Sequence, residues 1–219
     1  MEYGVNFTEI FEIDANPLSY EDYFLTNETQ KVGYVHHHLS IGGKGNLNIN
    51  NTSFENVFVS EEDIVGGVGG GATVFNHSME WERTGMAACH VGTMQKLLEK
   101  SIEYAQTRKS GGEVIGKKQA VSHRIATMKI QLEAARLLTY KSALGLEKNK
   151  ENTIHAASAK LFVSEAYVAA AMSTMQIFGG NGYMTEYGIE RIVRDALGST
   201  VYSGTSDIQR NIISRLLGL

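Results

Sequence analysis

The sequence predicts an α+β protein that is mainly α: an antiparallel up-and-down helical bundle preceded by a partial β-domain. Two observations predict this class. Apolar and polar residues often alternate up to residue 65, whereas from Ala72 onward the apolar residues recur at intervals of three and four. The change falls at the glycine-rich run from Gly66 to Gly71. We therefore expect two domains, a partial β-domain over residues 1–70 and a helical domain over residues 71–219.

Length and composition limit the partners and the cellular location that we expect for the protein. The 219 residues can bury a substantial core, and the net charge of −4 comes from interspersed charges of both signs, which do not indicate a nucleic-acid partner. The single cysteine, Cys89, excludes an intramolecular disulfide and suits a reducing compartment. The first residues do not read as a secretory signal, and no run approaches the length of a membrane span. We expect a cytoplasmic protein, or a mitochondrial-matrix protein in a eukaryote.

The first domain is interpreted as β-strands. Residues 5–13 and 46–50 show two-residue alternation, and residues 54–59 are aromatic and β-branched. The three consecutive histidines at 36–38 would alternate between the faces of a strand, so they cannot easily bind one ion, and no metal site is expected. The glycine run is expected to be a hinge or linker rather than a phosphate loop, because no Lys-Ser/Thr pair follows it.

Three long helices are expected in the second domain. They are separated by Ser110–Gly112 and by residues 149–152, and the glycine turn Gly179–Gly182 ends the third. The residues that recur at helical spacing are Met86, His90, Met94, Leu97, Leu98 and Ile102, then Val121, Ile125, Met128, Leu132 and Ala135, then Ala159, Phe162, Ala166, Ala169 and Ala170. Long helices with short connections form an up-and-down bundle.

Two shorter helices are expected after the glycine turn, over residues 184–197 and 206–217. Ser206 or Thr205 is a good N-cap for the second of them. The pair Arg194–Asp195 near the end of the first is interpreted as a buried structural ion pair.

Three motifs follow one another between Gln176 and Arg210. A turn with three glycines follows Gln176, residues 190–196 read ERIVRDA, and residues 202–210 read YSGTSDIQR. In this order the stretch resembles the C-terminal part of the acyl-CoA dehydrogenase family. The resemblance extends from about Ser53 to Leu219.

The resemblance implies an enzymatic activity and a glutamate that serves as its catalytic base. It implies an FAD-dependent α,β-dehydrogenation of an acyl thioester, either an acyl-CoA or an acyl-carrier protein, in which a glutamate removes the α-proton. Many members carry that glutamate just before Gly-Thr, where this chain has Ser203. Members of the isovaleryl and long-chain type carry it in L-x-x-E-R. Residues 79–83 read MEWER, with Met79 in place of the leucine, so the resemblance assigns the base to Glu82. Taken alone, Glu82 would be an ordinary solvated helix residue. A working base is expected to be partly desolvated.

The resemblance also implies residues that bind the cofactor and the substrate. The cofactor-binding positions are Arg108, Gln119, Gln176, Gly179, Gly180, Thr205 and Asp207. The substrate-binding positions are Arg83, Tyr202 and Gly204. A forked guanidinium suits the pyrophosphate of FAD, although Arg108 is also placed to meet the dipole of its own helix end. Gly111 departs from the family, which has an aromatic residue there.

The motifs of Arg108 and Gln176 meet the flavin of a neighbouring subunit in the family, which predicts a dimer or tetramer. The N-terminal helical domain and the segments that hold the flavin ring are not recognisable in this chain. We therefore expect the C-terminal half, or a subunit, of a split acyl-CoA dehydrogenase, completed by a chain that supplies the N-terminal domain. Electron-transferring flavoprotein is the family's usual electron acceptor. A non-catalytic assembly subunit that pairs with a complete homologue remains the alternative.

Overall fold

The structure is a computed structural model that describes residues 41–42, 46–47, 60–147 and 152–219. The strands predicted at 5–13 and 54–59 and the three histidines lie outside the described residues. The chain divides into two compact units, Met1–Ser78 and Met79–Leu219. The domain boundary expected at residue 70 stays a prediction.

The first unit contains short strands and turns in its described part. Strand β1 (Ile41–Gly42) pairs antiparallel with β2 (Asn46–Leu47), so the beginning of the alternating run at 46–50 is a strand. A short 3-10 helix, η2 (Glu61–Asp63), follows, and helix α2 (Gly71–Thr107) begins at the last glycine of the run. The glycines before it adopt positive φ angles of 87° at Gly66 and 82° at Gly69, which suit turns rather than regular structure.

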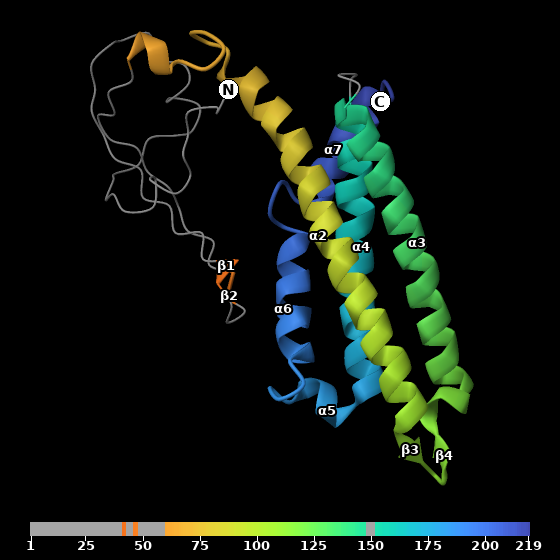
Figure 1. Cartoon of the computed structure of the whole chain (residues 1–219). Helices are drawn as coiled ribbons and strands as arrows, with labels where there is room; N and C mark the ends of the chain where they lie inside the picture. The colour runs from red at the N-terminus through yellow and green to blue at the C-terminus, as the bar shows by residue number, and fades with distance from the viewer. Residues whose placement is uncertain (1–40, 43–45, 48–59, 148–151) are drawn as a thin grey trace. The chain divides into compact units, whose positions relative to one another are not determined.

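The predicted helical bundle is confirmed. Helices α2, α3 (Gln119–Glu147) and α4 (Thr153–Phe178) are the three long helices, and they alternate in direction (Figure 1). Helices α6 (Ile189–Ser199) and α7 (Ser206–Leu216) are the two shorter ones, and both pack against α4. The fold class is therefore the expected one, with α4 at the centre of the second unit.

The connection between α2 and α3 contains a β-hairpin that was predicted only as a break. Strands β3 (Lys109–Ser110) and β4 (Glu113–Val114) pair antiparallel, and a short 3-10 helix, η3 (Ile115–Lys117), leads into α3. The two residues of the turn, Gly111 and Gly112, have φ angles of 66° and 85°. Two consecutive positive φ angles are what a tight two-residue hairpin requires, and glycine adopts them without a steric cost.

The segment after α4 also differs from the prediction. The glycine turn is itself a short helix, α5 (Gly180–Tyr183), and α6 begins at Ile189 rather than at residue 184. Gly188 precedes α6 with a left-handed φ of 66°, so the helix cannot extend back through it.

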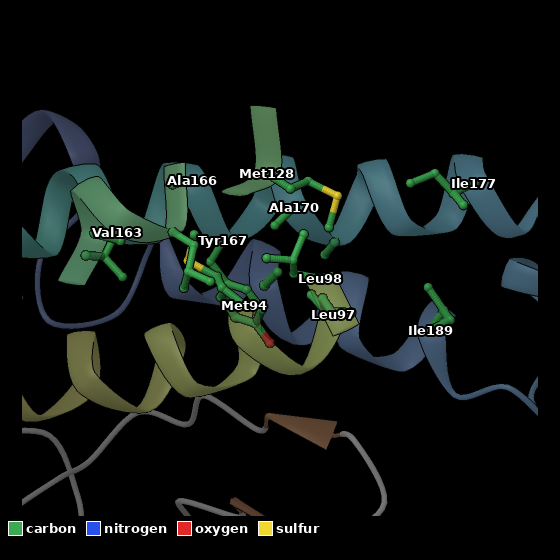
Figure 2. Packing of buried hydrophobic residues seen from close by; sticks show 14 of the residues in the cluster. Met94, Leu97, Leu98, Met128, Val163, Ala166, Tyr167, Ala170, Ile177 and Ile189 are labelled. Atoms are coloured by element: carbon green, nitrogen blue, oxygen red, sulfur yellow. The ribbon is translucent and has the colours of Figure 1, made fainter. Parts of the chain in front are cut away.

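The core lies where α2, α3 and α6 face α4. Figure 2 shows Met94, Leu97 and Leu98 pointing from α2 toward Tyr167 and Ala170 on α4. The residues predicted to line the helices are mostly buried, but Ile102 is exposed. The alanines of α4 leave room for close approach of its neighbours.

Against the expectation that no segment could span a membrane stands one helix, α4, and only by its length and composition. Among the described residues it alone has the length and composition of a span, with a mean hydropathy of 1.3. Half of that window is buried inside the bundle.

Candidate active site

The two positions at which the resembled family carries its base meet in this structure. Glu82 lies on α2, and Ser203 lies in the turn between α6 and α7, which we call the Ser203 turn (Thr200–Thr205). The Ser203 hydroxyl donates a hydrogen bond to the Glu82 carboxylate. Glu82 is exposed, so the partial desolvation expected from the sequence is not present in the described residues. The contact fixes one oxygen of the carboxylate against the turn.

The Ser203 turn has an unusual backbone. Ser203 has a φ of 56° and is the one non-glycine residue of positive φ in the part of the chain that the structure describes. Such a conformation costs on the order of 1–3 kcal/mol and persists only where the surroundings enforce it. Gly204 follows with a φ of 90°, and a Cβ added there would lie 2.7 Å from Nε2 of Gln209. Gly204 is therefore required by both conformation and space.

Three buried side chains hold the carbonyls of this turn. Ser203 O accepts hydrogen bonds from Arg83 Nε at 3.2 Å and from Gln209 Nε2 at 3.1 Å. Gly204 O accepts from Lys160 Nζ at 2.7 Å and from Gln209 Nε2 at 3.0 Å. Arg83, Lys160 and Gln209 are 7%, 4% and 0% exposed. They come from α2, α4 and α7, so three helices fix the turn.

Two residues predicted to bind substrate, Arg83 and Gly204, take part in these hydrogen bonds. Arg83 was predicted to bind substrate, and here its Nε is directed at a backbone carbonyl. Gly204 was predicted to bind substrate as well, and its carbonyl faces the buried Lys160. Sequence reasoning missed Lys160 and Gln209. A lysine within the alanine-rich, apolar α4 was the signal that could have identified the first.

The side chains of Lys160 and Arg83 are both buried, and the charge of Arg83 acts on Lys160. Burial, and then the charge of Arg83, lower the pKa of Lys160 to about 8, against a smaller opposing effect of Glu165. Burial also lowers the pKa of Arg83, and the carboxylates of Glu82 and Glu80 partly offset this effect. Arg83 remains charged because its ordinary pKa is so high.

Tyr202 of the Ser203 turn contacts a histidine, which stacks on a second tyrosine. Tyr202, predicted to bind substrate, has its hydroxyl 2.6 Å from His90 Nε2, and the His90 ring stacks on Tyr167 at 5.0 Å between centroids. Burial, and then the charge of Lys160, lower the pKa of His90 to about 4. Burial raises the pKa of Tyr202 and raises that of Tyr167 to about 12. All three rings are therefore neutral near pH 7, and Tyr202 anchors the start of the Ser203 turn.

The low pKa of His90 predicts a loss of stability in acid. As the pH falls through 6.5, the unfolded chain binds a proton at His90 that the folded chain does not bind until about pH 4. The free energy of unfolding should therefore fall by about 3 kcal/mol between pH 7 and pH 4 through this residue. Urea unfolding at several pH values measures it.

The matched control is His90→Gln, which keeps a hydrogen-bond partner for Tyr202 but does not titrate. Other acid-sensitive groups act equally in both chains, so the difference between their pH profiles isolates His90. Parallel profiles would contradict this prediction.

Thr205 and Asp207 lie at the beginning of α7. Thr205 is the N-cap, as expected, and its Oγ1 accepts from the Ile208 amide at 3.3 Å. Asp207 is exposed, and Arg210 Nη1 donates to it at 3.3 Å. Thr205 is the last residue of the Ser203 turn and Asp207 lies in the first turn of α7, so the two residues predicted to contact FAD within the chain directly follow Ser203 and Gly204.

The other predicted cofactor residues lie at the opposite end of the bundle. We call this the hairpin end, where α2 ends, α3 begins and α4 ends (Figure 1). The residues there are Arg108, Gln119, Gln176, Gly179 and Gly180, all of them exposed. Tyr104 stacks on Phe178 at 4.0 Å between centroids, and its hydroxyl accepts from Asn181 Nδ2 at 2.9 Å. These contacts tie the end of α2 to the end of α4.

The hairpin end is open at positions where the resemblance predicts contacts with FAD. Arg108 presents an exposed guanidinium. A Cβ added at Gly179 or Gly180 would meet no atom within 4 Å, so the backbone is open to a ligand there. The structure thus separates the predicted site residues into two groups within one chain.

The pair Arg194–Asp195, predicted to be a buried ion pair, is not buried. Arg194 is exposed and Asp195 is only half-buried.

Comparison with known proteins agrees with the family resemblance of the sequence. Residues 69–218 match the family model described as "Acyl-CoA dehydrogenase, C-terminal domain". An L-prolyl-[peptidyl-carrier protein] dehydrogenase of Pseudomonas fluorescens is 43% identical over 76% of this chain and 44% of its own length. An acyl-CoA dehydrogenase of Bacillus subtilis is 39% identical over 75% of this chain and 43% of its own.

Solved structures show the same similarity. The prolyl acyl carrier protein oxidase AnaB matches with a TM-score of 0.75 and 44% identity, over 77% of this chain and 44% of that one. The FAD complex of PigA matches with a TM-score of 0.73 and 36% identity, over the same shares. The chain therefore spans less than half the length of these relatives.

Proposed function

This chain belongs to the acyl-CoA dehydrogenase family, and we propose that it is the C-terminal half, or a subunit, of an FAD-dependent enzyme that dehydrogenates an acyl thioester. The observation that carries the proposal is the hydrogen bond from Ser203 to Glu82. It places the carboxylate at the turn from which other members of the family direct their base. In the proposal, position 82 on a helix and position 203 in a turn are therefore two places from which a glutamate can reach the same reacting carbon.

In this proposal Glu82 removes the α-proton of the bound thioester. Its support is a long helix, which can hold a carboxylate in a fixed position. The Ser203 hydroxyl selects one orientation of that carboxylate. When bound, FAD supplies the acceptor for the β-hydride. Arg108, Gln119, Gln176, Gly179 and Gly180 would hold the nucleotide of a neighbouring copy, and Thr205 and Asp207 would contact FAD within the same chain.

We propose a prolyl thioester on a carrier protein as the substrate. The support is that the relative at 43% identity and the structure at 44% are named as enzymes of prolyl carrier proteins, whereas the named acyl-CoA dehydrogenase is 39% identical. Electron-transferring flavoprotein is the proposed acceptor. The proposed location is the cytoplasm, or the mitochondrial matrix in a eukaryote.

The test begins with purification of the chain together with any protein that binds it. A flavin absorbance spectrum and a co-purifying chain are the expected result. The complex is then mixed anaerobically with prolyl-carrier protein or with a short acyl-CoA, and loss of flavin absorbance is followed. Bleaching by the prolyl thioester alone supports the full proposal, and bleaching by acyl-CoA alone overturns the substrate. If neither bleaches the flavin, the non-catalytic assembly subunit becomes the better explanation.

A dimer or tetramer is part of the proposal, and α3 offers a surface for it. Four apolar side chains, which we call the α3 stripe, lie 54–70% exposed on this helix: Ile130, Leu137, Tyr140 and Leu144. Their spacing of seven, with Tyr140 three after Leu137, keeps them on one face. An apolar stripe of this kind suits the same stripe of a second copy.

Leu137→Glu is expected to lower the oligomeric state, because it places a charge in the middle of the α3 stripe. Light scattering coupled to size exclusion at micromolar concentration measures the mass. Arg124→Glu is the control, since Arg124 is exposed on the same helix on roughly the opposite face from the stripe. A wild-type chain that is strictly monomeric would contradict the assembly, and an unchanged mass in Leu137→Glu would contradict the surface.

A further inference from the structure

Lys160 is a buried cation for which the proposed reaction has no direct use. It lies on α4, is 4% exposed, and donates to the Gly204 carbonyl at 2.7 Å. A buried ammonium is costly unless its hydrogen bonds are well placed. Its position is therefore informative about the turn that it holds.

The contacts of Lys160 lead stepwise to the carboxylate of Glu82. Lys160 and Gln209 fix the Gly204 carbonyl, and Gln209 with Arg83 fixes the Ser203 carbonyl. Fixing both carbonyls holds the peptide planes that follow Ser203 and Gly204, and so restrains the two consecutive residues of positive φ, Ser203 at 56° and Gly204 at 90°. In that conformation the Ser203 hydroxyl reaches Glu82.

We propose that Lys160 is a positioning residue for Glu82, which it orients through the Gly204 carbonyl and the Ser203 hydroxyl. The proposal rests on the proposed function for its catalytic consequence. Its structural part concerns the Ser203 turn alone and stands without a cofactor. The cost of a left-handed serine makes a buried clamp necessary, because an unclamped turn would relax toward a negative φ.

The first measurement is hydrogen exchange of the chain without cofactor. The Ser206 amide closes the turn by donating to Thr200 O at 3.1 Å, so its exchange reports the order of the turn. Lys160→Met removes the donor but keeps an unbranched stem, and should speed the exchange of Ser206 at least about tenfold. The Gly179 amide, bonded to Met175 O at the hairpin end, should exchange at the wild-type rate.

Two further variants serve as controls. Lys129→Met removes a lysine that is exposed and paired with Glu133, and should leave Ser206 exchange unchanged. Lys160→Gln retains an amide donor and should restore part of the protection. Wild-type exchange of Ser206 in Lys160→Met would overturn the proposal. Faster exchange of Gly179 in the same variant would overturn it as well, since Lys160 would then support the whole bundle.

The second measurement uses the complete flavin complex. Lys160→Met should slow flavin reduction about tenfold with little change in the substrate concentration needed for half-maximal rate. In a Ser203→Ala background the same change should have almost no effect, because the hydroxyl through which it acts is gone. Effects that multiply would overturn the pathway through Ser203. If Glu82→Gln is itself without effect, the proposed base is wrong, while the exchange result still decides whether Lys160 holds the turn.

Discussion

Glu82→Gln is expected to retain bound flavin but to lose its reduction by substrate, with a fall in rate of at least about a hundredfold. Glutamine keeps the shape of the side chain and can still accept the hydrogen bond from Ser203, but it cannot take a proton. Anaerobic stopped-flow absorbance of the complete complex measures the rate. The size of the effect follows from the loss of a general base, which no other residue at the Ser203 turn replaces in the proposal.

Ser203→Ala is the control for this experiment. It removes the partner of the carboxylate while leaving the carboxylate itself, so it should slow reduction much less. Reduction of the Glu82→Gln flavin at the wild-type rate would show that the base is another residue. A larger loss in Ser203→Ala than in Glu82→Gln would reverse their roles.

Leu97→Ala is expected to lower the free energy of unfolding by about 2–5 kcal/mol. Leu97 is fully buried between α2 and α4, where its truncation leaves a cavity that the packed helices cannot readily close. Urea unfolding of the isolated chain measures the loss. It should appear as an earlier midpoint with an unchanged slope.

Leu197→Ala is the matched control, because the same atoms are removed from a helix position that is 53% exposed. Its effect should stay within about 0.5 kcal/mol, as is usual for surface substitutions. Equal losses in the two variants would mean that the core described around α4 does not support the fold.

The helices could be predicted because their signals are local. Apolar spacing sets the face that each helix buries, and glycines mark where the helices stop. The hairpin at Gly111 and Gly112 was missed because its two consecutive glycines were read only as a break. Two adjacent glycines between short polar segments are also the pattern of a tight hairpin turn. The predicted start of α6 is too early because Gly188 adopts a left-handed φ that the helical spacing of the apolar residues does not reveal.

The Ser203 turn shows what a sequence does not reveal. Glu82 and Ser203 are 121 residues apart, and their contact depends on how α2 packs beside the turn after α6. The resemblance named both positions but could not show that they meet. Lys160 and Gln209 act through backbone carbonyls. Gln209 lies in the motif at residues 202–210, but its contact with the carbonyls is not visible in the motif, and Lys160 lies outside all three motifs. The predicted roles of the site residues in binding FAD and substrate remain predictions.

The length of α2 has a genetic consequence. Glu82 lies about three turns into α2 and Arg108 just beyond its end, which corresponds to roughly 39 Å along the helix axis. One rigid helix therefore keeps the two groups of one chain apart, and each proposed site draws Glu82 from one copy and Arg108 from its neighbour. Consider a cell that expresses a normal chain and a variant chain that lacks both the Glu82 carboxylate and the Arg108 guanidinium. If the two chains pair at random in equal amounts, about a quarter of the sites contain Glu82 and Arg108 from two normal chains. Such an allele would be inherited as dominant negative, even though its product folds.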